Sequence, residues 1–129
     1  MIYYIYDGSF EGFLTAIYEA YYREKNPDKI VKTKDYEKDL FSQKITIETD
    51  EEKADRVYEA IEKKISSSSL KRIYHAFLSE IANVEDDIFK YLKLGFKIGK
   101  KIDQHLTDDR VYKIKKISNK VSKEKHRLK

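Results

Sequence analysis

The stretch Tyr6–Tyr22, YDGSFEGFLTAIYEAYY, decides the predicted fold of the N-terminal half of the chain. It places a tight polar turn, Asp7-Gly8-Ser9, between a short apolar strand at residues 2–6 and a helix. Ser9 is the predicted N-cap of that helix, because its hydroxyl can accept a hydrogen bond from a first-turn amide. Apolar side chains then recur at intervals of three and four residues, which puts them on one side of an α-helix. They are Phe10, Phe13, Leu14, Ile17 and Tyr21.

The length and composition predict one cytoplasmic domain, residues 1–129. A chain of 129 residues can bury a core without disulfides or metal, and it contains no cysteine. No uncharged run approaches the roughly 18 residues that a membrane helix needs, and the N-terminus does not have the layout of a signal peptide. We therefore predict no membrane association, no cofactor and no metal site. No oligomeric state follows from these features.

Charge is divided unevenly along the chain. Residues 1–89 contain 13 Lys+Arg and 19 Asp+Glu, whereas residues 90–129 contain 14 and 4. Such asymmetry points to a polyanion as partner of the basic part. The alternative is that the lysines reflect the composition of an AT-rich genome, since the chain is rich in Lys, Ile and Tyr.

The remaining elements predict an α+β fold that is mostly helical. The alternation in KITIE (44–48) indicates a second strand, and Thr49 is the predicted N-cap of the helix that follows it. Residues 28–43 are interpreted as a loop whose Leu40 and Phe41 are held in the core. Because each strand is followed by a helix, we expect a short two-stranded parallel sheet packed against four to five helices.

Two glycines on the inward side of a predicted helix indicate a close approach. The helix runs from Asn83 to Leu106 and carries Gly95 and Gly99 on its apolar side. A helix that accepts about 1 kcal/mol per glycine usually lets another backbone pass nearby. We therefore expect a tight crossing at both glycines.

The last predicted helix, residues 108–129, carries a row of basic side chains beside its apolar line. Basic rows of this kind are typical of phosphate contacts, since each neutralised phosphate releases counterions. The hypothesis is non-sequence-specific nucleic-acid binding, and the alternative is a solvated lysine face. The side chains at spacings of three and four are Lys113, Lys116, Lys120, Lys123 and Arg127.

Two further groups are candidates for chemistry. The turn Asp7-Gly8-Ser9 exposes amides at a helix N-terminus and could hold phosphate, although the leading interpretation is a structural N-cap. No catalytic residue is assigned, but Asp7 is a candidate. So are His75, Asp103 and His105, which could form a metal or acid–base group. The alternative is that the two histidines cap helices or form buried hydrogen bonds.

Three segments together resemble a bacterial family of DNA-metabolism or DNA-repair proteins. They are YDGSFEGFLTAIYEAY (6–21), RIYHAFLSE (72–80) and DDIFKYLKLGFKIGKKIDQHL (86–106). The resemblance implies a DNA-related role beside a radical SAM protein, and in some members a similar domain is joined to a uracil-DNA glycosylase-like domain. Family members extend past the position that matches Lys129, so the chain is expected to correspond to their N-terminal part. The resemblance supplies no catalytic residues.

Three hypotheses follow. The leading one is a non-enzymatic module of a DNA repair or modification system, in which an acidic N-terminal body serves as scaffold or docking face and the basic helix contacts DNA. The second is part of a nucleic-acid-metabolising enzyme whose active site lies mostly outside this chain. The third is a protein–protein interaction domain that presents its basic helix to an acidic partner.

Overall fold

The computed structural model describes residues 1–23, 26–38 and 40–127; the side chains of residues 124–127 are outside the described part. The chain divides into two compact units, residues 1–59 and 60–129. We describe each unit by itself. The elements confirm a mostly helical α+β fold, with five α-helices and a small parallel sheet in the described residues.

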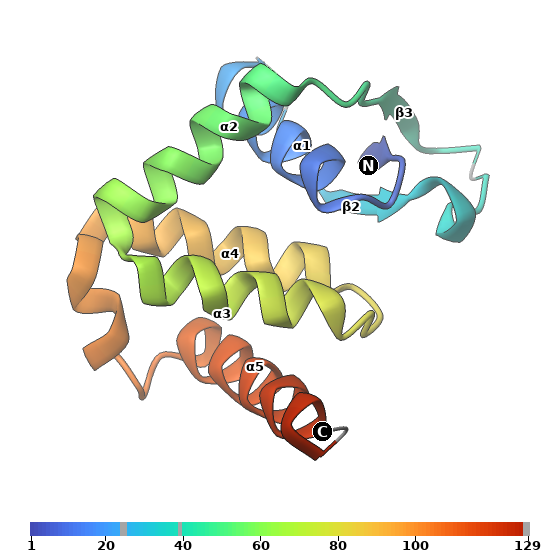
Figure 1. The fold of residues 1–129 in the computed structure, drawn as a ribbon. Coiled ribbons are helices and arrows are strands. Elements are labelled where there is room, and N and C mark those ends of the chain that lie inside the picture. The colour runs from blue at the N-terminus through green and yellow to red at the C-terminus, as the bar shows by residue number, and fades with distance from the viewer. Residues whose placement is uncertain (24–25, 39, 128–129) are drawn as a thin grey trace. The chain divides into compact units, whose positions relative to one another are not determined.

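The first unit is a three-stranded parallel sheet with two helices (Figure 1). The sheet order is β2-β1-β3, so the first strand of the chain is central. Its register sets Tyr4 of β1 between Ile30 of β2 and Ile45 of β3. The elements of this unit are β1 (Ile2–Tyr6), α1 (Phe10–Tyr22), β2 (Lys29–Lys32), a 3₁₀ turn η1 (Thr33–Asp35), β3 (Gln43–Thr46) and α2 (Glu51–Ala60).

Strand β2 corrects the predicted loop at 28–43, and the sheet therefore has three strands and not two. The segment KIVK is only four residues long, too short for alternation to stand out, and β1 supplies the pairing that holds it extended. The prediction for Leu40 and Phe41 was also wrong, because their side chains are 92% and 89% exposed. They lie between two short strands, where no helix places them against the core.

Helix α1 forms as its periodicity predicts. Phe13, Leu14 and Ile17 are buried, whereas Tyr21 at the end of the stripe is half-exposed. Ser9 is the N-cap and accepts the N–H of Gly12 at 2.9 Å. The predicted cap of α2 shifts by one residue: Asp50, and not Thr49, accepts the N–H of Lys53 at 3.0 Å.

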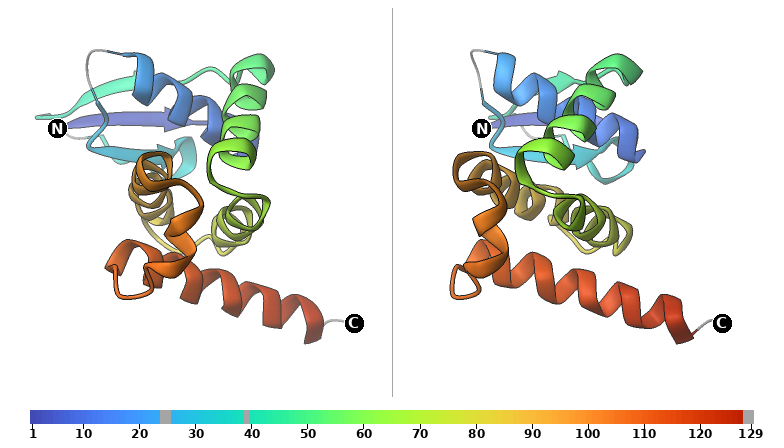
Figure 2. Two further views of the ribbon diagram at one scale, coloured as in Figure 1. Left: turned by 90° about the vertical axis from the view of Figure 1, so that its left-hand side faces the viewer. Right: turned by 60° about the vertical axis from the view of Figure 1, so that its left-hand side comes forward.

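The second unit is helical in the described residues. Ser66 caps α3 by accepting the N–H of Ser69, and α5 lies along one side of the α3–α4 pair (Figure 2). The buried line of α5 includes Val111, Ile114 and Ile117. The elements are a π-helical turn η2 (Ile61–Ile65), α3 (Ser67–Leu78), α4 (Val84–Ile98), a 3₁₀ segment η3 (Gly99–Gln104) and α5 (Asp109–Arg127).

The two glycines do meet a close neighbour, but only one lies inside the helix. A Cβ on Gly95 would stand 2.5 Å from Cδ1 of Ile65, and a Cβ on Gly99 would stand 3.4 Å from the carbonyl oxygen of Lys64. Both neighbours belong to η2; the close approach is confirmed at Gly95, whereas the contact at Gly99 is an ordinary van der Waals distance. Gly99 has φ +71°, so α4 ends there, and the predicted continuous helix to Leu106 was wrong. Leu106 is half-exposed after the 3₁₀ segment.

Candidate nucleic-acid interface

Helix α5 has one buried and one basic side. Asp108 opens the helix by accepting the backbone N–H of Arg110 at 2.9 Å, and its pKa is lowered to about 2, chiefly by the hydrogen bonds from the Arg110 side chain. The apolar line of α5 contacts α3 and α4. This packing fixes the rotation of the helix, so the opposite side must face outward.

The outward side carries lysines. Lys116, Lys120 and Lys123 are exposed, and none of them has an ion-pair partner among the described side chains. We call these three residues the basic face. At 1.5 Å per residue they span about 10 Å along the helix axis. The predicted member Arg127 lies in α5, but its side chain is outside the described residues.

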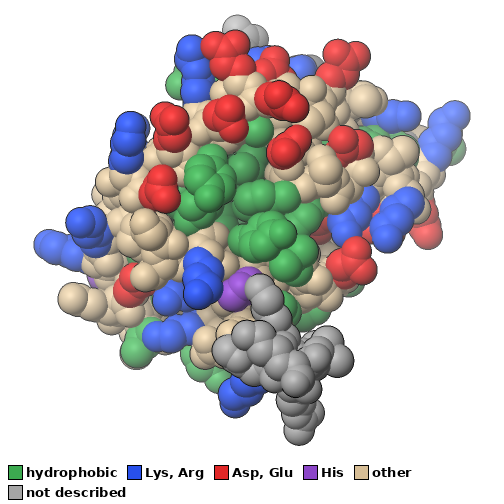
Figure 3. Space-filling model, viewed as in Figure 1, with side chains coloured by type: hydrophobic (Ala, Val, Ile, Leu, Met, Phe, Trp, Pro, Cys, Tyr) green, Lys and Arg blue, Asp and Glu red, His purple; other side chains and the backbone are tan. Residues whose placement is uncertain are grey.

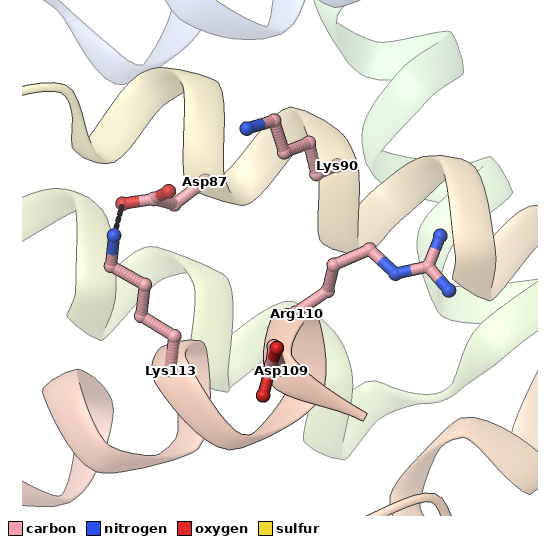
Figure 4. Close-up of a pocket in the computed structure, with 5 residues that line it drawn as sticks. All are labelled: Asp87, Lys90, Asp109, Arg110 and Lys113. Atoms are coloured by element: carbon pink, nitrogen blue, oxygen red, sulfur yellow. Dashed lines mark ion pairs between the residues drawn. The ribbon is translucent and has the colours of Figure 1, made fainter. Parts of the chain in front are cut away.

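Lys113 is engaged differently from the rest of the predicted row. Its Nζ lies 3.0 Å from Oδ2 of Asp87 on α4, as the dashed line in Figure 4 shows. This Oδ2 atom is buried, and no hydrogen-bond donor among the described residues is aligned with it. The positive charge of the Lys113 ammonium therefore compensates the negative charge of the Asp87 carboxylate. Lys113 therefore serves the α4–α5 contact.

A shallow hollow of about 190 Å³ surrounds this ion pair between α4 and α5 (Figure 4). Arg110 on its rim is held by Asp108 through two side-chain hydrogen bonds of 3.0 and 2.7 Å. Three of the charged groups that line the hollow, those of Asp87, Lys113 and Arg110, are thus paired within the protein. Its lining residues are Asp87, Lys90, Asp109, Arg110 and Lys113.

A second row of lysines went unnoticed in the sequence. Lys90, Lys93 and Lys97 are exposed on α4, at the spacings of three and four residues that mark one side of a helix. Lys93 Nζ lies 4.3 Å from the ring centroid of Phe89, a cation–π contact. The spacing rule that was applied to the last helix would have found this row as well.

The turn Asp7-Gly8-Ser9 is filled by its own side chains. Asp7 accepts hydrogen bonds from the Ser9 amide, the Ser9 hydroxyl and the Thr49 hydroxyl, at 2.9, 2.6 and 2.8 Å. The bond from the Ser9 hydroxyl is the main reason why the pKa of Asp7 lies below its ordinary value of 3.8. Oxygens of Asp7, Ser9 and Thr49 crowd the position of a Cβ on Gly12. A carboxylate thus occupies the place over the helix N-terminus that a phosphate would take.

The other candidates of the sequence are distributed over the second unit. His75 is buried on α3, whereas His105 is exposed at the end of η3. Asp103 accepts a hydrogen bond of 2.5 Å from Nη1 of Arg72, which also donates to the hydroxyl of Tyr91 at 3.1 Å. Among the residues that the structure describes, no three His, Asp or Glu side chains form a group that could hold a metal ion.

The comparison with known families matches the C-terminal part of the chain. A family model described as "Domain of unknown function (DUF4130)" matches residues 82–129, which contain α4, η3 and α5. No curated protein matches the chain, and no solved structure matches it. Within the described part of the chain, no helix has both the length and the apolar character needed to cross a membrane.

Proposed function

We propose that this chain binds nucleic acid through the basic face of α5, without reading its sequence. The observation that supports this proposal is the exposure of Lys116, Lys120 and Lys123 on one side of a packed helix, with no ion-pair partner among the described side chains. Each ammonium can approach a phosphate and release a counterion. Lysine is a flexible point charge, so such contacts position a backbone and do not distinguish bases.

The biological setting of the proposal is DNA repair or modification beside a radical SAM partner. This part rests on the resemblance of the segments at 6–21, 72–80 and 86–106. In this proposal the basic face meets DNA, and the acidic first unit offers the partner protein a docking face. Figure 3 shows acidic side chains gathered over α2, where Glu51, Glu52, Asp55 and Glu59 are exposed.

The salt dependence of binding tests the proposal quantitatively. Three phosphate contacts on duplex DNA give a slope of log K against log salt of roughly −2.7, so affinity should fall about 40-fold between about 50 and 200 mM salt. Fluorescence anisotropy with a labelled duplex and a labelled single strand measures this slope. Replacing all three lysines of the basic face by glutamine should flatten the slope by about 2.7.

A variant with the same net charge as the triple glutamine variant of the basic face serves as the control. Lys34, Lys38 and Lys71 are exposed lysines outside α5, and the triple change to glutamine there removes the same three charges. The slope of this control should equal that of the wild type. A flat salt response of the wild-type chain, or equal slopes of the two triple variants, would contradict the proposal. An acidic partner protein that is captured by the basic face in the absence of any DNA affinity would favour the interaction-domain alternative.

A further inference from the structure

We infer that two copies of this chain associate through strand β3, which pairs antiparallel with itself in the second copy. This inference concerns the first unit and does not depend on the proposed nucleic-acid binding. It starts from the sheet order β2-β1-β3, which leaves β3 at an edge of the sheet. Within the described residues, no strand pairs with the outer side of β3.

The ladder with β1 shows which groups this edge presents. Gln43 donates its backbone N–H to Met1 at 2.8 Å, and Ile47 donates its own to Ile5 at 2.7 Å. Backbone groups alternate in direction along a strand, so the residues between and after them face the other way. The N–H and C=O groups of Lys44 and Thr46 therefore point away from β1, as those of an edge strand do, and Glu48 follows two residues after the end of β3.

The sequence of this edge is complementary to itself. When KITIE (44–48) pairs antiparallel with a second copy about Thr46, Lys44 of each copy lies opposite Glu48 of the other. Thr46 faces Thr46, and Ile45 faces Ile47. Opposite charges, threonine pairs and β-branched pairs directly across two strands each stabilise the pairing. All the outward backbone groups identified above meet in this one register.

The opposite edge of the sheet lacks this complementarity. Asp28 donates its backbone N–H to Ile2 of β1, so Lys29 and Val31 carry the outward backbone groups of β2 (KIVK), and antiparallel pairing about Val31 would place Lys29 opposite Thr33 of a second copy. No carboxylate then lies opposite Lys29, and lysines on an edge commonly prevent association. Self-pairing is therefore disfavoured at β2 and favoured at β3.

Lys44 is available for the cross-strand pair with Glu48 of the second copy. Its side chain is exposed, and its Nζ lies 5.5 Å from the ring centroid of Tyr36. A cation–π contact covers one side of an ammonium and leaves N–H donors for a carboxylate.

Sedimentation equilibrium of the 129-residue chain over about three decades of concentration tests the inference. The wild type should form a dimer that dissociates on dilution. Lys44→Glu turns two attractive cross-strand pairs into two repulsive ones, and it should weaken the dimer by about tenfold or more. Glu48→Lys should do the same, and combining the two changes should restore the wild-type affinity.

Thr46→Pro gives an independent test. The N–H of Thr46 faces outward, so proline removes a bond of the dimer and none of the ladder with β1. It should abolish the dimer while the circular dichroism spectrum stays unchanged, and if this variant fails to fold, the charge-exchange series decides. A wild type that remains monomeric throughout would overturn the inference. So would a dimer that Lys44→Glu leaves intact, or one that the double exchange fails to restore.

Discussion

Two lysines one turn apart on α5 should respond differently to the same substitution. Lys113 pairs with the carboxylate of Asp87, whose side chain is only 14% exposed, whereas Lys116 belongs to the basic face. Methionine keeps most of the lysine stem and removes its charge in both cases. We therefore expect Lys113→Met to reduce the free energy of unfolding and Lys116→Met to reduce nucleic-acid affinity.

The expected magnitudes follow from burial. Removing one partner of a fully buried ion pair costs about 3–5 kcal/mol, and an exposed pair contributes about 0–1 kcal/mol. Because Asp87 is nearly enclosed while the Lys113 side chain is 58% exposed, we expect Lys113→Met to cost about 1–3 kcal/mol. Lys116→Met should stay within about 0.5 kcal/mol of the wild type, as surface substitutions do.

Urea denaturation and the salt slope of DNA binding measure the two effects separately. The midpoint of Lys113→Met should fall by about 0.5–1.5 M urea at an unchanged m-value of about 2 kcal/mol/M, while its slope of log K against log salt stays that of the wild type. Lys116→Met should keep its midpoint and lose about 0.9 of the slope. Asp87→Asn in the Lys113→Met background removes the unpaired charge and should recover part of the loss. The reasoning fails if Lys113→Met keeps its midpoint and flattens the slope as much as Lys116→Met.

Two further predictions concern the interior of the second unit and the Asp7 turn of the first. Tyr91 is fully buried, and its hydroxyl lies 3.0 Å from the hydroxyl of buried Ser69 and accepts from Arg72, so Tyr91→Phe should cost about 1–3 kcal/mol by leaving both groups without this partner. In urea denaturation the double variant with Ser69→Ala should cost less than the sum of the single changes, and strict additivity would contradict this coupling. The pKa of Asp7 is lowered on folding, so its stabilising contribution is complete above the ordinary value of 3.8 and is lost as the pH falls through the folded pKa. As the pH falls below about 4, the free energy of unfolding of Asp7→Asn should therefore decrease less than that of the wild type. Plots of the free energy of unfolding against pH that run parallel for the two proteins would refute this.

Local patterns predicted the elements whose causes are local. The α1 stripe and its Ser9 cap were found because periodicity and capping act within one turn of a helix. Gly95 was recognised as a contact point because an inward glycine needs a neighbour, which is Ile65. The end of α4 was missed, since Ile102 keeps the apolar spacing going past Gly99 although the backbone turns to φ +71° there.

What the sequence missed depends on partners far away along the chain. Thr49 has the sequence context of an N-cap, but its hydroxyl donates to Asp7, 42 residues earlier, and Asp50 takes the cap. Lys113 has the spacing of a phosphate-binding lysine, but Asp87 on the neighbouring helix engages it. Spacing determines which side of a helix a residue occupies, and only packing determines what that side meets.

The proposed dimer would double the number of basic faces that are available for the proposed nucleic-acid binding. Three lysines on about 10 Å of helix provide only a few phosphate contacts, so one basic face alone should bind weakly and lose its affinity at moderate salt. A dimer through β3 would carry two basic faces on one particle. When both can reach the same nucleic acid, the second contact becomes intramolecular and avidity exceeds the affinity of either face. Weak single contacts then still permit release, because each face dissociates on its own, while the pair retains the protein on the strand.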